Sequence, residues 1–547
     1  MAPARSSSPA PGRIRARCCG AVLAGILLAL ALLMGPSGAL AAAEPLPSFP
    51  ALSAQLGQAL VPDAAADLTA HDDDPLYRIR ATYAPETHSL DGRLRAEYRN
   101  RGDETLTDLG LYTFANASAF HGASLTLSHV AINGQAVSPR PLEQGAAQLI
   151  DLQRPCAPGQ LLVFSAAFHL VLSMTAGDNG LDEQSADQAC LYAWYPVIAG
   201  RAAGAWQLHP LNDLTDPCAL DMAHVLVELT VPAGMAVASG GAVINERPST
   251  ASGRIVTIAA PFTRDLAVVI GSQLHAQSAT VGATTVVSWA VPSLTTAAQA
   301  SLDIAAKALA LYSAFGPYPY ARLSVVQTPM SQDAEGMESS SLILISSLIP
   351  SELGVGKAPL DAAAQKTVDF VYNLVVSHEV AHQWFYNLVG SDPYRAPWLD
   401  ESLADWSDNY YLESHASGHA ADAGWAESAM DITKSGCLNR SAAGTVDSYR
   451  DKGEDYESVV YARGGLMYQA LRRRLGPQRF LTFLRSWVAD HRYEIADQAA
   501  WRAAIIQALG PADGAAFAST WLDGAGMTAQ DIVSAAQTAP ALDPVAP

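Results

Sequence analysis

The stretch Ser377-His378-Glu379-Val380-Ala381-His382-Gln383-Trp384 contains the pattern His-Glu-x-x-His inside an apolar run from Val368 to Val389. The run has no Pro or Gly before Gly390, which predicts a helix. Side chains four residues apart share one face of a helix, so the imidazoles of His378 and His382 point the same way. Zinc accepts imidazole nitrogens at roughly 2.0–2.1 Å, and the pair therefore predicts two ligands of a zinc site.

Glu401 offers a third ligand, because eighteen residues separate it from His382 and a second helix can bring it back. Three protein ligands leave one position for water, which is typical of catalytic zinc. Glu379 stays near the metal without binding it, where a base must lie to take a proton from the water. A chance His-Glu-x-x-His would have to coincide with the helix and Glu401, so we predict one catalytic zinc ion held by His378, His382 and Glu401.

Composition excludes some classes of protein. A chain of 547 residues is too long for one ordinary core and predicts two to four domains. Apolar residues make up 50% and charged residues only 16%, which indicates well-buried globular domains. The net charge of −20 comes without a basic stripe to neutralise phosphates, so we expect no nucleic-acid partner.

Residues 1–43 have the pattern of a secretory signal peptide. Four arginines between positions 5 and 17 precede an apolar core at 20–34, and small residues at 39–43 offer a cleavage site. The apolar core is shorter than the ~20 residues that span a bilayer comfortably. We expect a cleaved signal and a secreted, envelope or periplasmic protein without stable membrane insertion. The alternative is an uncleaved signal that anchors the protein.

Four cysteines remain after the signal: Cys156, Cys190, Cys218 and Cys437. An exported protein with an even number of cysteines has up to two disulfides here, and three pairings are open. We favour Cys190 with Cys218, because both flank one loop-like region. Buried free thiols are the alternative.

The period of the hydrophobic pattern divides the rest of the chain. Residues 44–74 have weak periodicity and predict a loosely ordered lead-in, whereas residues 75–291 alternate between apolar and polar positions and predict an antiparallel β-sandwich. After Pro292 the period becomes helical, so residues 292–530 predict a mainly helical α+β catalytic domain. Residues 531–547 predict a frayed tail. The expected strands of the sandwich are 76–83, 93–99, 161–172, 224–231, 254–259, 265–270 and 284–291.

With these residues assembled, the chain resembles the gluzincin metallo-aminopeptidase family that includes aminopeptidase N and leukotriene-A hydrolase. The zinc spacing matches, and Trp398-Leu399-Asp400-Glu401-Ser402 looks like the family's Trp-Leu-Asn-Glu-Gly, with departures at Asp400 and Ser402. The resemblance covers residues 75–526. It implies an N-terminal β-sandwich followed by a thermolysin-like catalytic domain, a two-domain form without the C-terminal helical domain of many relatives.

The resemblance also implies a substrate strand. Glu335-Gly336-Met337-Glu338-Ser339 occupies the place of the family's Gly-x-Met-Glu-Asn, with departures at both ends. By resemblance Glu338 binds the free α-amine of a peptide, and Gly336 and Met337 contact the substrate. The physics agrees, because an exopeptidase must place a negative charge where an ammonium is buried. A solvated carboxylate at the end of a strand is the alternative for Glu338.

Two tyrosines five residues apart, Tyr456 and Tyr461, resemble a pair in the family. The resemblance makes Tyr461 the stabiliser of the oxyanion, since a phenol donates a hydrogen bond without bringing charge. Arg463 replaces the family's Lys, and either tyrosine is alternatively a core or rim aromatic. Asp405 lies four residues after Glu401, on the same helical face, and is a candidate partner for a zinc-binding imidazole. An ordinary surface aspartate is the alternative.

These residues together lead us to expect an exported zinc aminopeptidase that acts on peptides, with Glu379 as the general base. One alternative is a zinc endopeptidase with the same chemistry, in which no amine engages Glu338. A second is a binding module that zinc stabilises and that has lost catalysis.

Overall fold

Alternating apolar and polar side chains form the long strands at the start of the fold, as the sequence predicts. In β1 (Leu76–Ala84) and β2 (Ser89–Arg99) every second side chain is buried. The structure is a computed structural model. It describes residues 49–117, 122–174, 181–186, 188–202, 204–209, 214, 219–249, 253–330, 335–349, 362–415, 418–449, 453–537, 539 and 542.

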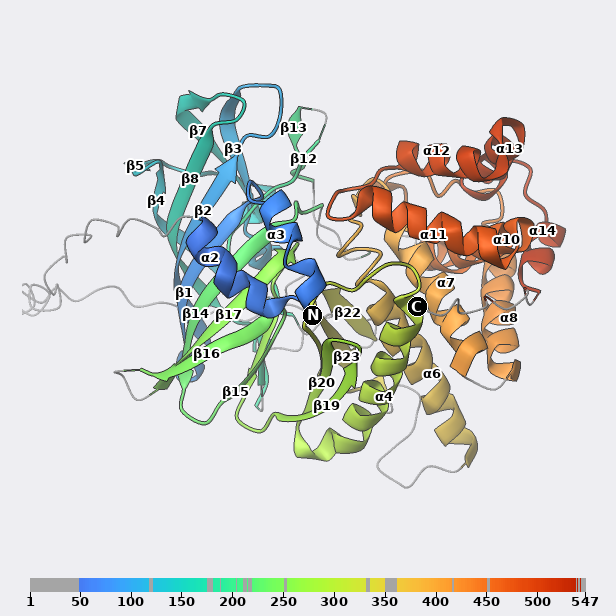
Figure 1. Ribbon diagram of the computed structural model, residues 1–547, viewed down its shortest axis with the longest axis horizontal. Helices are drawn as coiled ribbons and strands as arrows, with labels where there is room; N and C mark the ends of the chain where they lie inside the picture. Colours follow the sequence, from blue (N-terminus) through green and yellow to red (C-terminus); the bar gives the residue numbers. More distant parts are fainter. Residues whose placement is uncertain are drawn as a thin grey trace, which may run out of the picture. The chain divides into compact units, whose positions relative to one another are not determined.

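The largest sheet has eight strands in the order β16-β17-β14-β1-β2-β8-β4-β5. Its β1 and β14 are parallel, and the other pairs are antiparallel. Figure 1 shows these strands in blue to green. The remaining bounds are β4 Ser124–Ile132, β5 Gln135–Ala136, β8 Leu161–Val171, β14 Ala223–Pro232, β16 Ala242–Pro248 and β17 Gly253–Thr263.

Two four-stranded sheets, β15-β18-β10-β9 and β11-β3-β7-β6, share a continuous hydrophobic core with the large sheet. The expected N-terminal β-domain followed by a mainly helical domain is therefore confirmed. The bounds are β3 Leu106–Tyr112, β6 Arg140–Leu142, β7 Ala147–Cys156, β9 Glu183–Gln184, β10 Gln188–Leu191, β11 Val197–Ile198, β15 Ala236–Ser239 and β18 Val268–Gly271, with a small hairpin of β12 Arg201–Ala202 and β13 Ala205–Trp206.

A separate five-stranded sheet, in the order β19-β20-β21-β23-β22, carries the helical half of the protein. Strand β20 (Thr284–Ala290) pairs with β21 (Arg322–Thr328), so the prediction that residues 284–291 belong to the sandwich was wrong. The helical pattern after Pro292 marks the start of α4. The five-stranded sheet begins earlier, because β19 and β20 precede Pro292. The other strands are β19 His275–Val281, β22 Gly336–Ser339 and β23 Leu342–Ser346.

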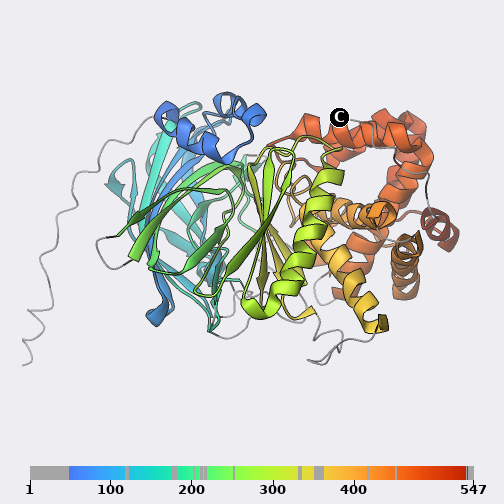
Figure 2. The ribbon, with the colours of Figure 1, turned by 60° about the horizontal axis from the view of Figure 1, so that its bottom comes forward.

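Helices α4 (Thr295–Tyr312) and α6 (Ala362–Ala381) pack on the five-stranded sheet, as Figure 2 shows. Side chains of β21 and β23, such as Val326 and Leu344, belong to the hydrophobic core of the β-rich half. The later helices are α7 Trp398–His415, α8 Gly418–Ser435, α9 Gly453–Tyr456, a π-helix at Glu457–Ala462, α10 Arg463–Leu475, α11 Pro477–His491, α12 Gln498–Leu509, α13 Pro511–Trp521 and α14 Ala529–Ala535.

The predictions of a loosely ordered lead-in at 44–74 and a frayed tail at 531–547 were wrong for the described parts of both segments. The lead-in is ordered from residue 49, with helices α2 (Phe49–Leu56) and α3 (Asp67–Ala70), and the Val61 N–H donates to the Pro319 carbonyl at 2.9 Å. At the other end, α14 occupies part of the expected tail because Thr528 and Asp531 cap its first turn reciprocally.

The predicted signal peptide lies outside the described residues. Within the part of the chain that the structure describes, none of the helices has the length and apolarity to cross a bilayer. Cys156, Cys190 and Cys437 are buried free thiols. The free thiol at Cys190 contradicts the favoured disulfide, whose other partner, Cys218, lies outside the described residues.

Candidate metal centre and substrate site

The last turn of α6 and the residue that follows it bring the two predicted imidazoles together, with ring centroids of His378 and His382 4.8 Å apart. The helix ends at Ala381, earlier than the apolar run to Val389 suggests. Beyond it the backbone forms wider turns, because the Asn387 N–H donates to the carbonyl of His382 at 2.9 Å. The apolar run continues because these turns are buried, and burial does not distinguish a helix from a turn.

Helix α7 supplies the third predicted ligand from its first turn. Glu401 Oε2 lies 3.3 Å from Nε2 of His378 and 3.4 Å from Nε2 of His382. The preceding Asp400 supports this turn, since its Oδ1 accepts a hydrogen bond from the backbone N–H of Glu401 at 2.9 Å. The structure therefore brings together all three residues predicted to bind zinc.

The second nitrogen of each imidazole is also in contact with an acceptor. His378 Nδ1 lies 3.3 Å from Asp408 Oδ2, and His382 Nδ1 lies 2.9 Å from the carbonyl oxygen of Phe385. Such contacts fix the tautomer and leave each Nε2 to face a metal. The site thus has the oriented imidazoles that zinc ligands require.

The predicted partner Asp405 does not make the contact with His378. A Cβ atom at Gly465 would come within 2.0 Å of Asp405 Oδ2, so this carboxylate faces α10. Asp408 lies seven residues after Glu401, two helical turns along the same face of α7, which is the signal that could have identified it.

The charges of the three residues favour a bound cation. Although burial opposes the shift, hydrogen bonds from His378 and His382 hold the pKa of the Glu401 carboxyl well below its usual range. The pKa of His378 is raised well above its ordinary value, against the effect of burial, by Asp408 and Glu401. One anionic oxygen and two nitrogens converge, and this donor set fits a zinc ion.

Glu379 lies beside these ligands and is almost completely buried. Its Oε2 has no hydrogen-bond partner among the described residues. Burial raises the pKa of Glu379 to about 7, even though the two imidazoles act to lower it. A carboxylate with a pKa near neutrality and an unsatisfied oxygen can exchange a proton with a water molecule.

Strand β22 places the predicted substrate residues at the edge of the five-stranded sheet. Glu338 is only 5% exposed, and its Oε1 lies 3.9 Å from His382 Nδ1. Glu338, Glu379 and His382 present ligand atoms within 4.8 Å of one another. Gly336 and Met337 precede Glu338 on this edge strand, and Gly336 lies against Glu379.

Tyr461 lies on the other side of the site, on the π-helix. Its ring stacks on that of His378 at a centroid distance of 6.0 Å, and burial and the nearby Glu401 carboxylate raise the pKa of its hydroxyl well above the ordinary value. Tyr456 is fully buried and packs edge-on against Tyr461 at 5.8 Å and against Tyr449 at 5.4 Å. The structure therefore places Tyr461 in the site and Tyr456 in the core behind it.

The sequence analysis missed two residues that reach the site from the β-rich half. Arg264 donates hydrogen bonds to the carbonyls of Tyr386 at 2.7 Å and Asn387 at 2.9 Å, in the turns after α6. Asp265 accepts hydrogen bonds from the Ser339 hydroxyl at 2.9 Å and the Tyr386 hydroxyl at 3.0 Å. No local pattern in the sequence indicates contacts over such separations.

Comparison with known proteins agrees with this geometry. Residues 300–521 match the peptidase family M1 domain. Aminopeptidase M1-D of Oryza sativa subsp. japonica is 27% identical over 197 residues, which are 35% of this chain and 22% of the rice protein. Aminopeptidase N of Lactococcus lactis subsp. lactis is 31% identical over 162 residues, 27% of this chain and 18% of that protein. The matches thus span about a fifth of these relatives.

Solved structures extend the likeness to both halves of the fold. The M1 zinc metallopeptidase of Deinococcus radiodurans superposes with a TM-score of 0.57 over 86% of this chain and 96% of its own, at 20% identity. A mutant of that enzyme has been solved with a Tyr-Ser-Ala substrate, with a TM-score of 0.56 over the same shares and at 20% identity. The three convergent ligands and the buried acidic residue of β22 lie where the resemblance to gluzincin metallopeptidases leads us to expect them. The match of residues 300–521 to the peptidase family M1 domain, together with the similar aminopeptidases, confirms the resemblance seen in the sequence.

Proposed function

We propose that the chain is an exported zinc aminopeptidase that hydrolyses the N-terminal peptide bond of peptides. One observation carries the proposal: the buried carboxylate of Glu338 lies 3.9 Å from the imidazole of His382, on an edge strand beside the metal centre. A buried negative charge beside the reacting bond suits a substrate with a free α-ammonium.

Each catalytic role falls on a described side chain. His378, His382 and Glu401 would hold a zinc ion, which would supply a Lewis acid and a water whose pKa is lowered toward ~7. Glu379 takes a proton from the attacking water and gives it to the leaving amine, which suits a pKa of about 7. Tyr461 donates a hydrogen bond to the developing oxyanion of the substrate carbonyl.

Two substrates that differ in one group test the proposal. The purified mature protein should hydrolyse an aminoacyl peptide with a free amine and reject its N-acetylated form. Equal cleavage of both would support the endopeptidase alternative and would leave Glu338 without its proposed role. A chelator should abolish hydrolysis, and added zinc should restore it.

The general base has its own test. The Glu379→Gln variant should keep its zinc content and lose turnover by several orders of magnitude, and retained turnover would contradict the assignment. If the unmodified protein hydrolyses neither peptide while chelation lowers its melting temperature, the zinc-stabilised binding module is supported instead.

Export rests on residues 1–43 alone. Sequencing the N-terminus of the protein recovered from the native host should show a start near residues 39–44. An intact N-terminus in a membrane fraction would favour the anchored form.

A further inference from the structure

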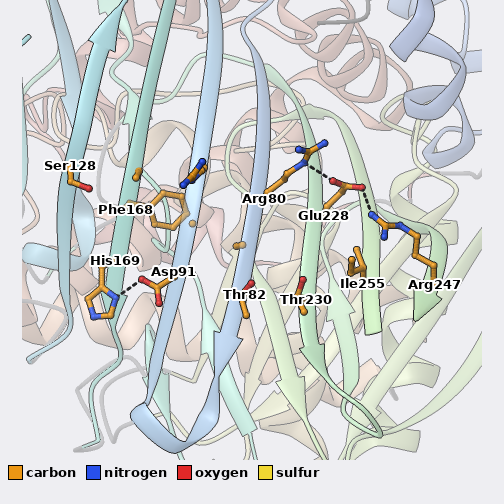
Figure 3. A pocket seen from close by; sticks show the side chains of 14 residues that line it. Arg80, Thr82, Asp91, Ser128, Phe168, His169, Glu228, Thr230, Arg247 and Ile255 are labelled. Atoms are coloured by element: carbon orange, nitrogen blue, oxygen red, sulfur yellow. Dashed lines mark hydrogen bonds and ion pairs between the residues drawn. The ribbon is translucent and has the colours of Figure 1, made fainter. Parts of the chain in front are cut away.

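The outer face of the eight-stranded sheet carries a groove of about 690 Å³ that seven strands line. Figure 3 shows it. Short side chains such as Thr82, Thr230 and Ser128 leave the space open, and longer ones such as Arg80 and Arg247 border it. Arg93 also lines the groove. None of the proposed metal ligands or catalytic residues contributes to its lining, so any role of the groove goes beyond the proposed peptidase.

Arginines lie directly opposite one another on this face, although like charges in facing positions are unfavourable in a sheet. In the antiparallel pair β1 and β2, Arg78 lies opposite Arg95 and Arg80 lies opposite Arg93. Residues two apart on a strand share a face, so the four side chains form one block. Like charges directly opposite each other destabilise a sheet. A binding partner of opposite charge would relieve this cost.

Nearby carboxylates neutralise only part of the block. Glu228 lies 2.7 Å from Arg80 and also 2.9 Å from Arg247, and Arg95 pairs with Glu97 at 3.7 Å. Within the described part of the chain, neither Arg78 nor Arg93 has an ion-pair partner. Positive charge without a partner is notable in a chain whose net charge is −20.

We propose that this groove binds a small phosphorylated ligand, with Arg93 as its main anchor. Guanidinium groups bind phosphate oxygens in bidentate fashion, and Arg80 and Arg93 lie opposite each other to offer two such groups. Thr82, Thr230 and Ser128 add hydroxyl donors at the groove. Its volume falls in the range of about 300–1,000 Å³ that is usual for small-molecule sites.

The charge of the whole protein favours a small ligand over a polymer or a membrane. Salt screens charges beyond about 8 Å at physiological ionic strength, so a compact anion held between Arg80 and Arg93 meets local charges. The groove is lined by three arginines (Arg80, Arg93 and Arg247) and by two carboxylates, of which Glu228 pairs with Arg80 and Arg247 and Asp91 with His169. A long polyanion or an anionic bilayer would extend over surfaces of a protein with net charge −20 and be repelled.

Calorimetric titration with fructose 1,6-bisphosphate tests the proposal. The wild type should bind it saturably, fructose should not bind, and citrate should bind more weakly. Arg93→Gln should weaken binding at least tenfold. Arg140→Gln, an exposed arginine on β6 of another sheet, is the matched control and should bind like the wild type.

A second readout separates a binding arginine from a structural one. In low salt without ligand, Arg93→Gln should melt at the same or a higher temperature, because a like-charge contact is removed. Absence of saturable binding, equal binding by Arg93→Gln, or binding only to anionic vesicles or long polyphosphate would overturn the proposal. A lower melting temperature of Arg93→Gln with unchanged affinity would mean that the arginine block is structural.

Discussion

Glu379 and Gly336 are in direct contact: a Cβ atom at position 336 would come within 2.3 Å of Glu379 Oε1. The proposed general base can therefore lie this close to the proposed substrate strand only because residue 336 has no side chain. Gly336→Ala should displace the Glu379 carboxylate by a fraction of an ångström to an ångström. We expect kcat to fall by about 10²-fold with zinc content unchanged, because small misplacements of reacting groups cause losses of this size.

Steady-state kinetics and metal analysis of Gly336→Ala give the answer. Gly57→Ala is the matched control, because a Cβ there would meet only Leu68 at 3.9 Å. A kcat of Gly336→Ala equal to that of the wild type would show that Glu379 has room to move and that the contact is unimportant.

Asp408 should control zinc affinity through His378, whose Nδ1 it contacts at 3.3 Å. Removing the partner of a zinc-binding imidazole typically weakens metal affinity 10- to 100-fold. We expect such a loss in Asp408→Asn, measured by competition with a chelator. Asp405→Asn should bind zinc much like the wild type because Asp405 faces α10, and a larger effect of Asp405→Asn would reverse the assignment.

Tyr461 should act on turnover and not on substrate binding. Tyr461→Phe keeps the ring that stacks on His378 and removes the hydroxyl. Loss of one oxyanion donor costs about 10²–10³ in kcat, with KM little changed. Tyr456→Phe is the control, since Tyr456 is buried in the core. Similar losses in both variants would indicate a packing effect.

Asp182 should make stability depend on pH. It is fully buried, and burial raises its pKa to about 7, although the N–H groups of Tyr192 and Ala193 act to lower it. An unfolded Asp titrates near about 4, so between pH ~4 and ~7 the folded state binds more protons. Stability therefore falls as pH rises through this window, by up to about 4 kcal/mol.

Thermal unfolding at pH 5 and pH 8 checks this dependence. The amide oxygen of Asp182→Asn can still accept hydrogen bonds from both backbone N–H groups. The difference between the melting temperatures at pH 5 and pH 8 should be smaller in this variant than in the wild type. The exposed Asp63→Asn variant should follow the wild type. An unchanged difference in Asp182→Asn would mean that the carboxyl ionises in the fold at little cost.

The sequence predicted the fold class and the zinc ligands because both depend on short-range patterns. Alternation identified β1 and β2, where one face is buried. It missed β3, because four consecutive residues at its end are buried and no alternation remains. It misassigned β20 because the pattern of a strand does not reveal which sheet it joins.

The site shows the same limit. His378 and His382 were found by helical spacing, and Glu401 by the eighteen residues that separate it from His382. Asp408 was missed and Asp405 favoured, because which of them reaches His378 depends on how α7 faces α6. The role of Arg264 could not be predicted because three of its acceptors, the carbonyls of Tyr386, Asn387 and Glu494, lie more than a hundred residues away along the chain. Long-range contacts of single side chains leave no periodic signal.

The hydrogen bonds of Arg264 and Asp265 mean that the helical half of the protein depends on contacts from the β-rich half. A fragment beginning at Pro292 would leave the carbonyls of Tyr386 and Asn387 without their guanidinium and Ser339 without its carboxylate acceptor. Shortened versions of the protein, and chimaeras made from relatives, would have to keep both halves from the same parent.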